Sequence, residues 1–335
     1  MKWIFRICML IGLGLVAIAG YAIATARGSP RPVGFQLTRL VDGQAHPMSI
    51  GIWYPTSASP RPTTLLGSTL LKVAPDGPVL GQRLPVIVLS HGNGGGLASH
   101  VDLAMDLAAA GYVVAAPMHA GDSFADQSAA GSARLYSERA QQVRATLDFM
   151  LGLWGGRGHI DPDRVGAFGM SAGAFTVLTL IGAQPDMTLI ASHCAANPEF
   201  ICKVLRQAGS RLLDRNADTG EFALDPRIRA AVLVAPGLGF AFARDGLAGV
   251  HIPVQLWVGE RDHTVPFATN GGIIRKGLAG RVEFHEARGA NHLSFLSPCG
   301  LLRPPALCSD PPDFDREAFH TTMNAELVRF FDIRL

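Results

Sequence analysis

The chain has 335 residues, of which 48% are hydrophobic and 17% charged, and its formal net charge is +2. This length and composition fit one large globular domain, or two smaller ones, with ample core. The sequence has no basic run, so nothing in it favours nucleic acid as a partner.

The N-terminus has the composition of a signal peptide. Lys2 and Arg6 flank the start of an apolar run over residues 7–24, and Ala24-Thr25-Ala26 places small residues where a signal peptidase reads them. We expect cleavage after Ala26. The alternative is an uncleaved signal anchor, because about 20 apolar residues suffice to span a bilayer. In either case we expect residues 27–335 to be periplasmic or secreted, with membrane contact only if the segment stays attached.

Cysteine usage agrees with that location. The four cysteines of the mature part form two locally spaced pairs. Three connectivities are possible, and in an oxidising compartment we expect the local one, Cys194–Cys202 and Cys299–Cys308. Each short loop would stabilise the fold by roughly 2–3 kcal/mol in the chain-entropy model. No metal site is expected, since neither pair has Cys-x-x-Cys spacing and no histidine pair lies beside them at ligand spacing.

The elements in chain order begin with a hairpin and continue as alternating strands and helices. Residues 33–40 and 48–54 have strand patterns on either side of Asp42-Gly43, which predicts an antiparallel hairpin. Residues 55–84 are rich in proline and glycine and predict a long surface loop. Further strands are expected at 86–89, 112–116, 165–168, 230–235, 254–258 and 282–286, and helices at 98–110, 133–151, 174–183 and 316–331. This order predicts an α/β fold: a mostly parallel sheet with the hairpin at its N-terminal edge and helices on both faces.

One long segment, residues 184–227, interrupts the alternation. It contains the first cysteine pair and a short helical pattern at 204–213. Insertions into such sheets lie over the carboxyl ends of the strands, where ligands bind. We expect either a lid over a binding site or a plain surface excursion, and the sequence favours neither.

A glycine-flanked serine follows the strand at 165–168. The stretch Gly169-Met170-Ser171-Ala172-Gly173 has the G-x-S-x-G pattern of a nucleophile elbow, in which the serine occupies a strained strand-to-helix turn. The turn exposes the Ser171 hydroxyl at a helix N-terminus, where backbone N–H groups stabilise negative charge. The alternative is a Gly/Ser turn in an ordinary strand–helix unit.

A serine nucleophile needs a histidine to take its proton and a carboxylate to orient that histidine. In elbow folds these follow in the order serine, acid, histidine, each on a loop after a later strand. Asp262 follows the strand at 254–258, with Glu260 as the second choice. His292 follows the strand at 282–286. A solvated acidic turn and a structural histidine are the alternatives.

Two other histidines are candidates for the same role. His285 falls inside a predicted strand and His320 on the final predicted helix, so His292 is the best placed of the three.

The oxyanion hole requires two backbone N–H groups aimed at the developing charge. We expect one from Ala172 and one from the loop Ser90-His91-Gly92-Asn93-Gly94-Gly95-Gly96, where Asn93 is the first choice and Gly94 the next. The loop matches neither G-x-G-x-x-G nor a P-loop, so a phosphate cradle is disfavoured. His91 is predicted to brace the loop and not to take part in catalysis.

These motifs resemble those of the α/β-hydrolases. The chain also contains Ile52-Trp53-Tyr54-Pro55-Thr56 and Asn291-His292. Together these motifs make it similar to the bacterial secreted proteins called predicted dienelactone hydrolases, which are related to the platelet-activating-factor acetylhydrolases. The resemblance implies a carboxylic ester hydrolase that forms an acyl-enzyme and needs no cofactor. Its implied substrate is a small molecule: a short-acyl ester, a lactone or an acetylhydrolase-like lipid.

The sequence departs from these relatives in two ways. The elbow of true dienelactone hydrolases carries cysteine, and here Ser171 stands in its place. The acetylhydrolases place their acid after the strand that follows the elbow helix, whereas residues 235–239 contain no acid and Asp262 must serve. The alternatives are an acyltransferase or lipase with the same triad, and a hydrolase-like binding protein without catalysis.

Overall fold

The computed structural model describes residues 26–42, 46–66, 69–214, 217–242, 245–300 and 304–335, with ten scattered positions before residue 26. Most of the predicted signal peptide, residues 1–26, and Gly43 of the predicted hairpin turn lie outside the described residues. Among the residues that are described, no helix is both long and apolar enough to cross a membrane.

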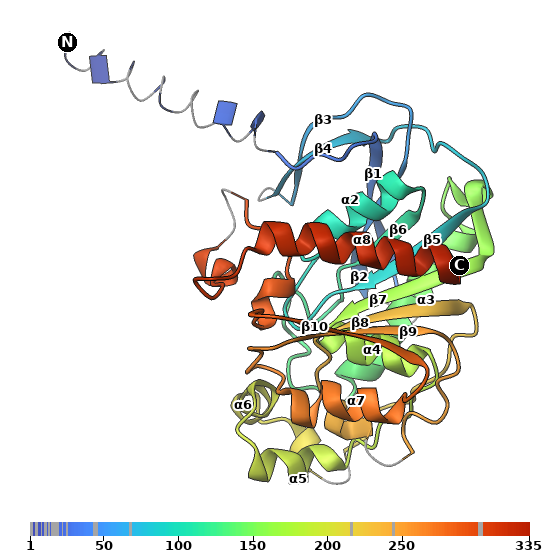
Figure 1. Ribbon diagram of the computed structural model, residues 1–335, viewed down its shortest axis with the longest axis vertical. Helices are drawn as coiled ribbons and strands as arrows, with labels where there is room; N and C mark the ends of the chain where they lie inside the picture. Colours follow the sequence, from blue (N-terminus) through green and yellow to red (C-terminus); the bar gives the residue numbers. More distant parts are fainter. Residues whose placement is uncertain are drawn as a thin grey trace.

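The described residues form one ten-stranded sheet in the order β10-β9-β8-β7-β5-β6-β2-β1-β4-β3 (Figure 1). Neighbouring strands from β5 to β10 pair in parallel, whereas β2 pairs antiparallel with both β1 and β6. The predicted mostly parallel sheet with an N-terminal antiparallel hairpin is therefore confirmed, but the hairpin is not at the edge of the sheet, because β4 pairs with β1 and β3 lies outermost. The strands are β1 (Val33–Val41), β2 (Pro47–Pro55), β3 (Arg61–Leu65), β4 (Thr69–Pro75), β5 (Leu84–Ser90), β6 (Val113–Pro117), β7 (Ile160–Met170), β8 (Ile228–Val234), β9 (Val254–Gly259) and β10 (Val282–Ala287).

Helices cover both faces of the sheet, because the central strands are apolar on both sides. Every residue of β5 is buried, and its side chains alternate between two cores: Val86 and Val88 face one, Ile87 and Leu89 the other. Helices α2 (Val101–Ala110) and α8 (Arg316–Arg334) pack on one face, in front of the sheet in Figure 1. The other face carries α3 (Leu135–Gly152), α4 (Ala172–Leu180) and α7 (Gly271–Gly277).

The prediction of a long surface loop over residues 55–84 is wrong. Strands β3 and β4 form an antiparallel hairpin there, and β4 joins the main sheet by pairing parallel with β1. The buried side chains of Leu65, Leu71 and Val73 hold this hairpin against the core. Pro62 is tolerated because β3 is the edge strand of the sheet, where a missing N–H donor breaks no ladder.

The insertion contains two short helices, α5 (Leu189–Ala196) and α6 (Phe200–Gln207). The helical pattern predicted at 204–213 is thus displaced: α6 starts earlier, and a separate 3₁₀ turn follows at Arg211–Leu213. Gly209, with a φ of +59°, lies between the two. A left-handed residue of this kind ends a helix.

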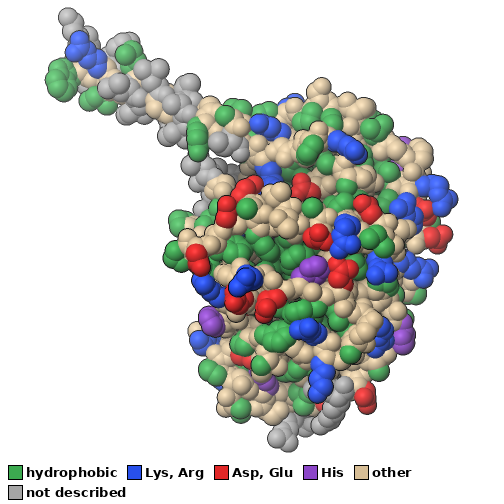
Figure 2. Space-filling model, viewed as in Figure 1, with side chains coloured by type: hydrophobic (Ala, Val, Ile, Leu, Met, Phe, Trp, Pro, Cys, Tyr) green, Lys and Arg blue, Asp and Glu red, His purple; other side chains and the backbone are tan. Residues whose placement is uncertain are grey.

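On the face shown in Figure 2, acidic and basic groups are interspersed among polar and apolar ones and do not segregate by sign.

Candidate active site

Ser171 lies in a sharp turn between β7 and α4. Its backbone has φ +57° and ψ −118°, a left-handed conformation that is strained for a residue with a side chain. The chain passes very close to itself here: a Cβ at Gly169 would lie 2.2 Å from Gly173 O, and one at Gly173 would lie 1.9 Å from Ser90 O. Only glycine fits at both positions, as the elbow pattern predicts.

The structure brings the three predicted residues together. Nε2 of His292 lies 3.0 Å from Oγ of Ser171, and Nδ1 of His292 lies 2.7 Å from Oδ2 of Asp262. Each residue follows the carboxyl end of a parallel strand: Ser171 follows β7, Asp262 follows β9 and His292 follows β10. Because these ends meet at one edge of the sheet, residues up to 121 positions apart form a continuous hydrogen-bond chain.

Asp262 is positioned to fix the orientation of His292. Its other carboxylate oxygen, Oδ1, accepts the backbone N–H groups of Thr264 (2.9 Å) and Val265 (3.0 Å). With Oδ2 facing His292, the carboxylate directs the proton of the imidazole to Nδ1. Nε2 is then left with a free lone pair toward the Ser171 hydroxyl, the arrangement that a general base requires.

The other candidates for the acid and the histidine make different contacts. Glu260, the second choice for the acid, accepts the Gly289 N–H at 2.7 Å. His285 stacks on Trp257 with a ring separation of 4.2 Å. His320 pairs with Asp102 inside the core and does not reach Ser171.

The loop after β5 lies beside the nucleophile, since a Cβ at Gly92 would come within 3.3 Å of Ser171 Cβ. Among the hydrogen bonds of the described chain, the N–H groups of Asn93 and Ala172 have no acceptor, so both are available to an oxyanion. The Gly94 N–H, in contrast, donates to Asp122 Oδ1 at 2.9 Å. Gly94 is therefore engaged elsewhere, and Asn93 and Ala172 stay the candidates.

A buried ion pair contacts this loop through both of its partners. Arg139 of α3 is fully buried, and its Nη1 lies 2.5 Å from Oδ2 of Asp122. Its Nη2 donates to the carbonyl of His91, and its Nε lies 3.2 Å from Oγ1 of Thr176. Asp122 in turn accepts the side-chain amide of Asn93 at 2.6 Å. The ion pair thus holds the loop at two points, the His91 carbonyl and the Asn93 side chain.

Two buried histidines complete this support. Nδ1 of His91 donates to the Gly92 carbonyl at 2.7 Å, and Nε2 accepts the His119 N–H at 3.1 Å. Burial, together with the positive charge of Arg139, lowers the pKa of His91 to about 3. The same two causes hold the pKa of His119 well below its usual value. Both side chains are therefore neutral at physiological pH, and His91 braces the loop as predicted.

Sequence reasoning did not find Arg139 or Asp122. One signal was present: Arg139 shares a helical face with Val143 and Leu147, which are buried. A cation in an apolar stripe needs a buried anionic partner. Asp122 had no local signal, because it lies in an irregular loop after β6.

The insertion is attached at the same edge of the sheet. The side chain of His193 in α5 stacks on Phe240 with 3.6 Å between ring centroids. Buried Glu199 accepts hydrogen bonds from His193 (3.0 Å), Thr269 (2.6 Å) and Asn270 (3.2 Å). Phe240 follows β8 and Thr269 follows β9, so α5 lies against loops at the carboxyl ends of strands. Its action as a lid stays a prediction.

Both predicted disulfides are present, Cys194–Cys202 between α5 and α6 and Cys299–Cys308 after the His292 turn. Across the described residues, His, Cys, Asp and Glu side chains form no group of three or more that could hold a metal ion.

Comparison with known proteins adds family and fold. Residues 62–151 match the family described as platelet-activating factor acetylhydrolase, isoform II. The fold is similar to that of a ferulic acid esterase from Streptomyces cinnamoneus, with a TM-score of 0.61 over 93% of this chain and 92% of that one, at 18% identity. The chain therefore has the α/β-hydrolase fold. No protein with a curated description matches its sequence significantly.

The family match covers part of the candidate site. It includes the loop after β5, Asp122 and Arg139, and it ends before Ser171, Asp262 and His292. The match supports the predicted enzyme class, a carboxylic ester hydrolase. The likeness to the ferulic acid esterase, at its low identity, establishes the fold.

Proposed function

We propose that this α/β-hydrolase is a serine esterase in which Ser171, His292 and Asp262 form the catalytic triad. The observation that carries the proposal is the hydrogen-bond chain from Ser171 Oγ to His292 Nε2 (3.0 Å) and from His292 Nδ1 to Asp262 Oδ2 (2.7 Å). These two hydrogen bonds connect a nucleophile on a strained turn to a base whose tautomer is set by a buried carboxylate.

The first half of the reaction acylates the enzyme. Ser171 Oγ attacks the ester carbonyl carbon while its proton passes to His292 Nε2. The negative charge on the former carbonyl oxygen is stabilised by the N–H groups of Asn93 and Ala172. As the tetrahedral intermediate collapses, the bond to the alcohol oxygen breaks, and His292 returns the proton to the departing alcohol.

The second half releases the acid. Water gives a proton to His292 Nε2 and attacks the acyl carbon of the Ser171 ester, and the same two N–H groups hold the oxyanion. Collapse expels Ser171 Oγ, which takes the proton back from His292. Asp262 stays ionised throughout and stabilises the imidazolium that forms in each half.

The proposed substrate is a small carboxylic ester, such as a short-acyl ester, a lactone or an acetylhydrolase-like lipid. An ester substrate is supported by the partial family match to platelet-activating factor acetylhydrolase and by the fold shared with a ferulic acid esterase. The two disulfides fit an oxidising compartment, which supports a periplasmic or secreted enzyme.

The test is hydrolysis of p-nitrophenyl acetate, butyrate and octanoate by the wild type and by Ser171→Ala. The proposal predicts serine-dependent turnover that falls with acyl length. Turnover that rises with length would indicate a lipase instead, and product transfer to an added alcohol would indicate an acyltransferase. Equal inactivity of both proteins on all three esters would contradict the proposal.

A further inference from the structure

The turn His292–Phe295 is anchored at one residue, Ser294. Its N–H donates to Asn291 Oδ1 at 3.0 Å and its Oγ accepts the Asn291 N–H at 3.1 Å, which forms a capping box. Its Oγ also lies 2.7 Å from Asp310 Oδ1. A hydroxyl has one proton, and the nearer, charged acceptor takes it, so Ser294 donates to Asp310.

The carbonyl of Ser294 is held from the opposite side. It lies 2.9 Å from Nε2 of His320, whose Nδ1 lies 2.6 Å from Oδ2 of Asp102. Both ring nitrogens of His320 therefore lie within hydrogen-bond distance of an oxygen atom. The turn is thus fixed between His320 of α8, which Asp102 of α2 holds, and the segment that carries Asp310.

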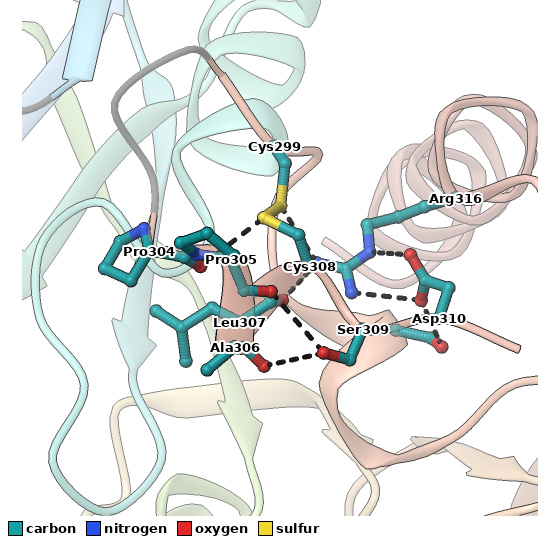
Figure 3. Close-up of a disulfide and its surroundings, with 10 residues drawn as sticks. Cys299, Pro304, Pro305, Ala306, Leu307, Cys308, Ser309, Asp310 and Arg316 are labelled. Carbon is teal, nitrogen blue, oxygen red and sulfur yellow. Dashed lines mark hydrogen bonds and ion pairs between the residues drawn. A yellow bond between two sulfur atoms is a disulfide. The ribbon is translucent and has the colours of Figure 1, made fainter.

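Asp310 is in turn held by Arg316, the first residue of α8. The guanidinium binds the carboxylate at two points, with Nε 2.8 Å from Oδ2 and Nη2 3.0 Å from Oδ1. Its Nη1 lies 2.9 Å from the Leu307 carbonyl and 3.6 Å from Sγ of Cys299. Figure 3 shows Arg316 extending from its helix to Asp310, with the disulfide Cys299–Cys308 beside it. Arg316 is buried, with 6% of its side chain exposed.

The disulfide closes the segment onto the turn. Cys299 lies soon after Phe295, and Cys308 directly precedes Ser309 and Asp310. The Ser309 carbonyl accepts the side-chain amide of Asn291 at 2.7 Å. Ser309 and Asp310 therefore contact both residues of the capping box, and the disulfide fixes where these two residues lie.

We propose that Asp310 and Arg316 are positioning residues for His292, and that the Cys299–Cys308 disulfide keeps them in place. The inference rests on the proposed function, because it gives His292 a catalytic task. The Nε2 of His292 must stay within hydrogen-bond reach of Ser171 Oγ, and a displacement of about 1 Å in an active site can cost about a hundredfold in rate. None of the three groups touches Ser171 or Asp262.

Two sets of substitutions break the contacts that hold the His292 turn, each at a different point. Asp310→Asn keeps the size of the side chain and removes the charge that Arg316 binds. Cys299→Ser with Cys308→Ser opens the loop. Each has a matched control: Asp313→Asn removes a carboxylate of the same segment that pairs at two points with exposed Arg261 (2.9 and 3.1 Å), and Cys194→Ser with Cys202→Ser opens the other disulfide.

The kinetic test measures kcat and KM for p-nitrophenyl acetate. We expect kcat to fall between about tenfold and a hundredfold in both test variants, with KM within about twofold of the wild type. Asp313→Asn should keep the wild-type kcat. Asp310→Glu, which restores the charge, should recover part of the loss. A folded Asp310→Asn variant with wild-type kcat would overturn the proposal, as would a kcat loss of equal size in Asp313→Asn.

The second readout is independent of turnover. The His292 Nδ1 proton, bonded to Asp262, should give a far-downfield proton NMR signal, and the signal should broaden or shift in Asp310→Asn but not in Asp313→Asn. An unchanged signal in Asp310→Asn would overturn the proposal. If the wild type hydrolyses no ester, the proposed function fails, and this signal still decides whether Asp310 positions His292. Asp310→Asn leaves both cysteine pairs intact, so the test holds even if the cysteine variant does not fold.

Discussion

Arg139 and Asp122 form a fully buried ion pair, with 2.5 Å between Nη1 and Oδ2, directly beneath the loop that presents the Asn93 N–H. Each partner also binds that loop, Arg139 at the His91 carbonyl and Asp122 at the Gly94 N–H. The pair therefore serves both stability and the geometry of the proposed oxyanion hole.

Removal of one partner should damage both properties. Arg139→Met leaves the Asp122 carboxylate buried without a countercharge, which typically costs about 3–5 kcal/mol. We expect a loss of that size in urea unfolding, and a fall in kcat for p-nitrophenyl acetate measured on the folded fraction. Arg134→Met, which breaks the exposed pair with Asp218 at the start of the same helix, is the control and should leave both unchanged. Wild-type stability in Arg139→Met would refute this role.

The backbone strain at Ser171 gives a second prediction. Its φ of +57° is unfavourable for alanine and acceptable for glycine. We expect Ser171→Gly to be more stable than Ser171→Ala by about 1 kcal/mol, while neither variant has esterase activity. Urea midpoints of the two variants measure the difference. A glycine variant no more stable than the alanine variant would mean that the turn is not strained.

Substitution of the two acids of the loop after β9 should change kcat by very different amounts. In serine proteases, replacing the triad aspartate by asparagine lowers kcat about 10⁴-fold because the histidine takes the wrong tautomer. We expect a loss of that order in Asp262→Asn. Glu260→Gln should keep most of the activity, because that side chain contacts Gly289 and not His292. Steady-state kinetics on p-nitrophenyl acetate compares them, and the reverse ranking would move the acid to Glu260.

Two buried histidines, His91 in the loop and His119 beside it, predict how stability depends on pH. Burial and Arg139 lower the pKa of His91 to about 3, below the value of about 6.5 that it has in the unfolded chain. Between these values the unfolded state binds more protons than the folded state, so stability is full above about pH 6.5 and falls as the pH drops toward 3. His119, whose pKa is also lowered, adds a loss of the same sign.

The slope of the unfolding free energy against pH measures this effect. Each neutral buried histidine contributes about 1.4 kcal/mol per pH unit within that window. His91→Gln should reduce the slope of the unfolding free energy against pH, measured in urea between pH 4 and 6. His251→Gln, at an exposed position, is the control and should keep the wild-type slope. An unchanged slope in His91→Gln would show that His91 binds a proton in the folded state.

Local motifs with a steric cause could be predicted from sequence. The Gly169 and Gly173 positions have no room for a Cβ, so the elbow pattern carries its own structural requirement. The order of serine, acid and histidine is that of elbow folds, and parallel strand ends that meet at one edge bring the three loops together. For that reason Asp262 and His292 could be chosen from loops remote in sequence, although their catalytic roles stay predictions. The disulfide pairing could be chosen because each loop is short.

Features that depend on tertiary context could not be predicted. The hairpin of β3 and β4 was hidden by prolines, which an edge strand tolerates and a central strand does not. The partnership of Arg139 with Asp122 joins a helix to an irregular loop, and no spacing rule links them. The network from Arg316 through Asp310 to Ser294 likewise depends on where α8 begins relative to the His292 turn.

The central claim is that Ser171 is an activated nucleophile. The most direct measurement is labelling of the folded protein by a fluorophosphonate, followed by peptide mapping of the modified site. We expect stoichiometric labelling at Ser171 in the wild type, strongly reduced labelling in a folded His292→Ala variant, and none in Ser171→Ala. Absence of labelling at Ser171 in the folded wild type, or equal labelling with and without His292, would contradict it.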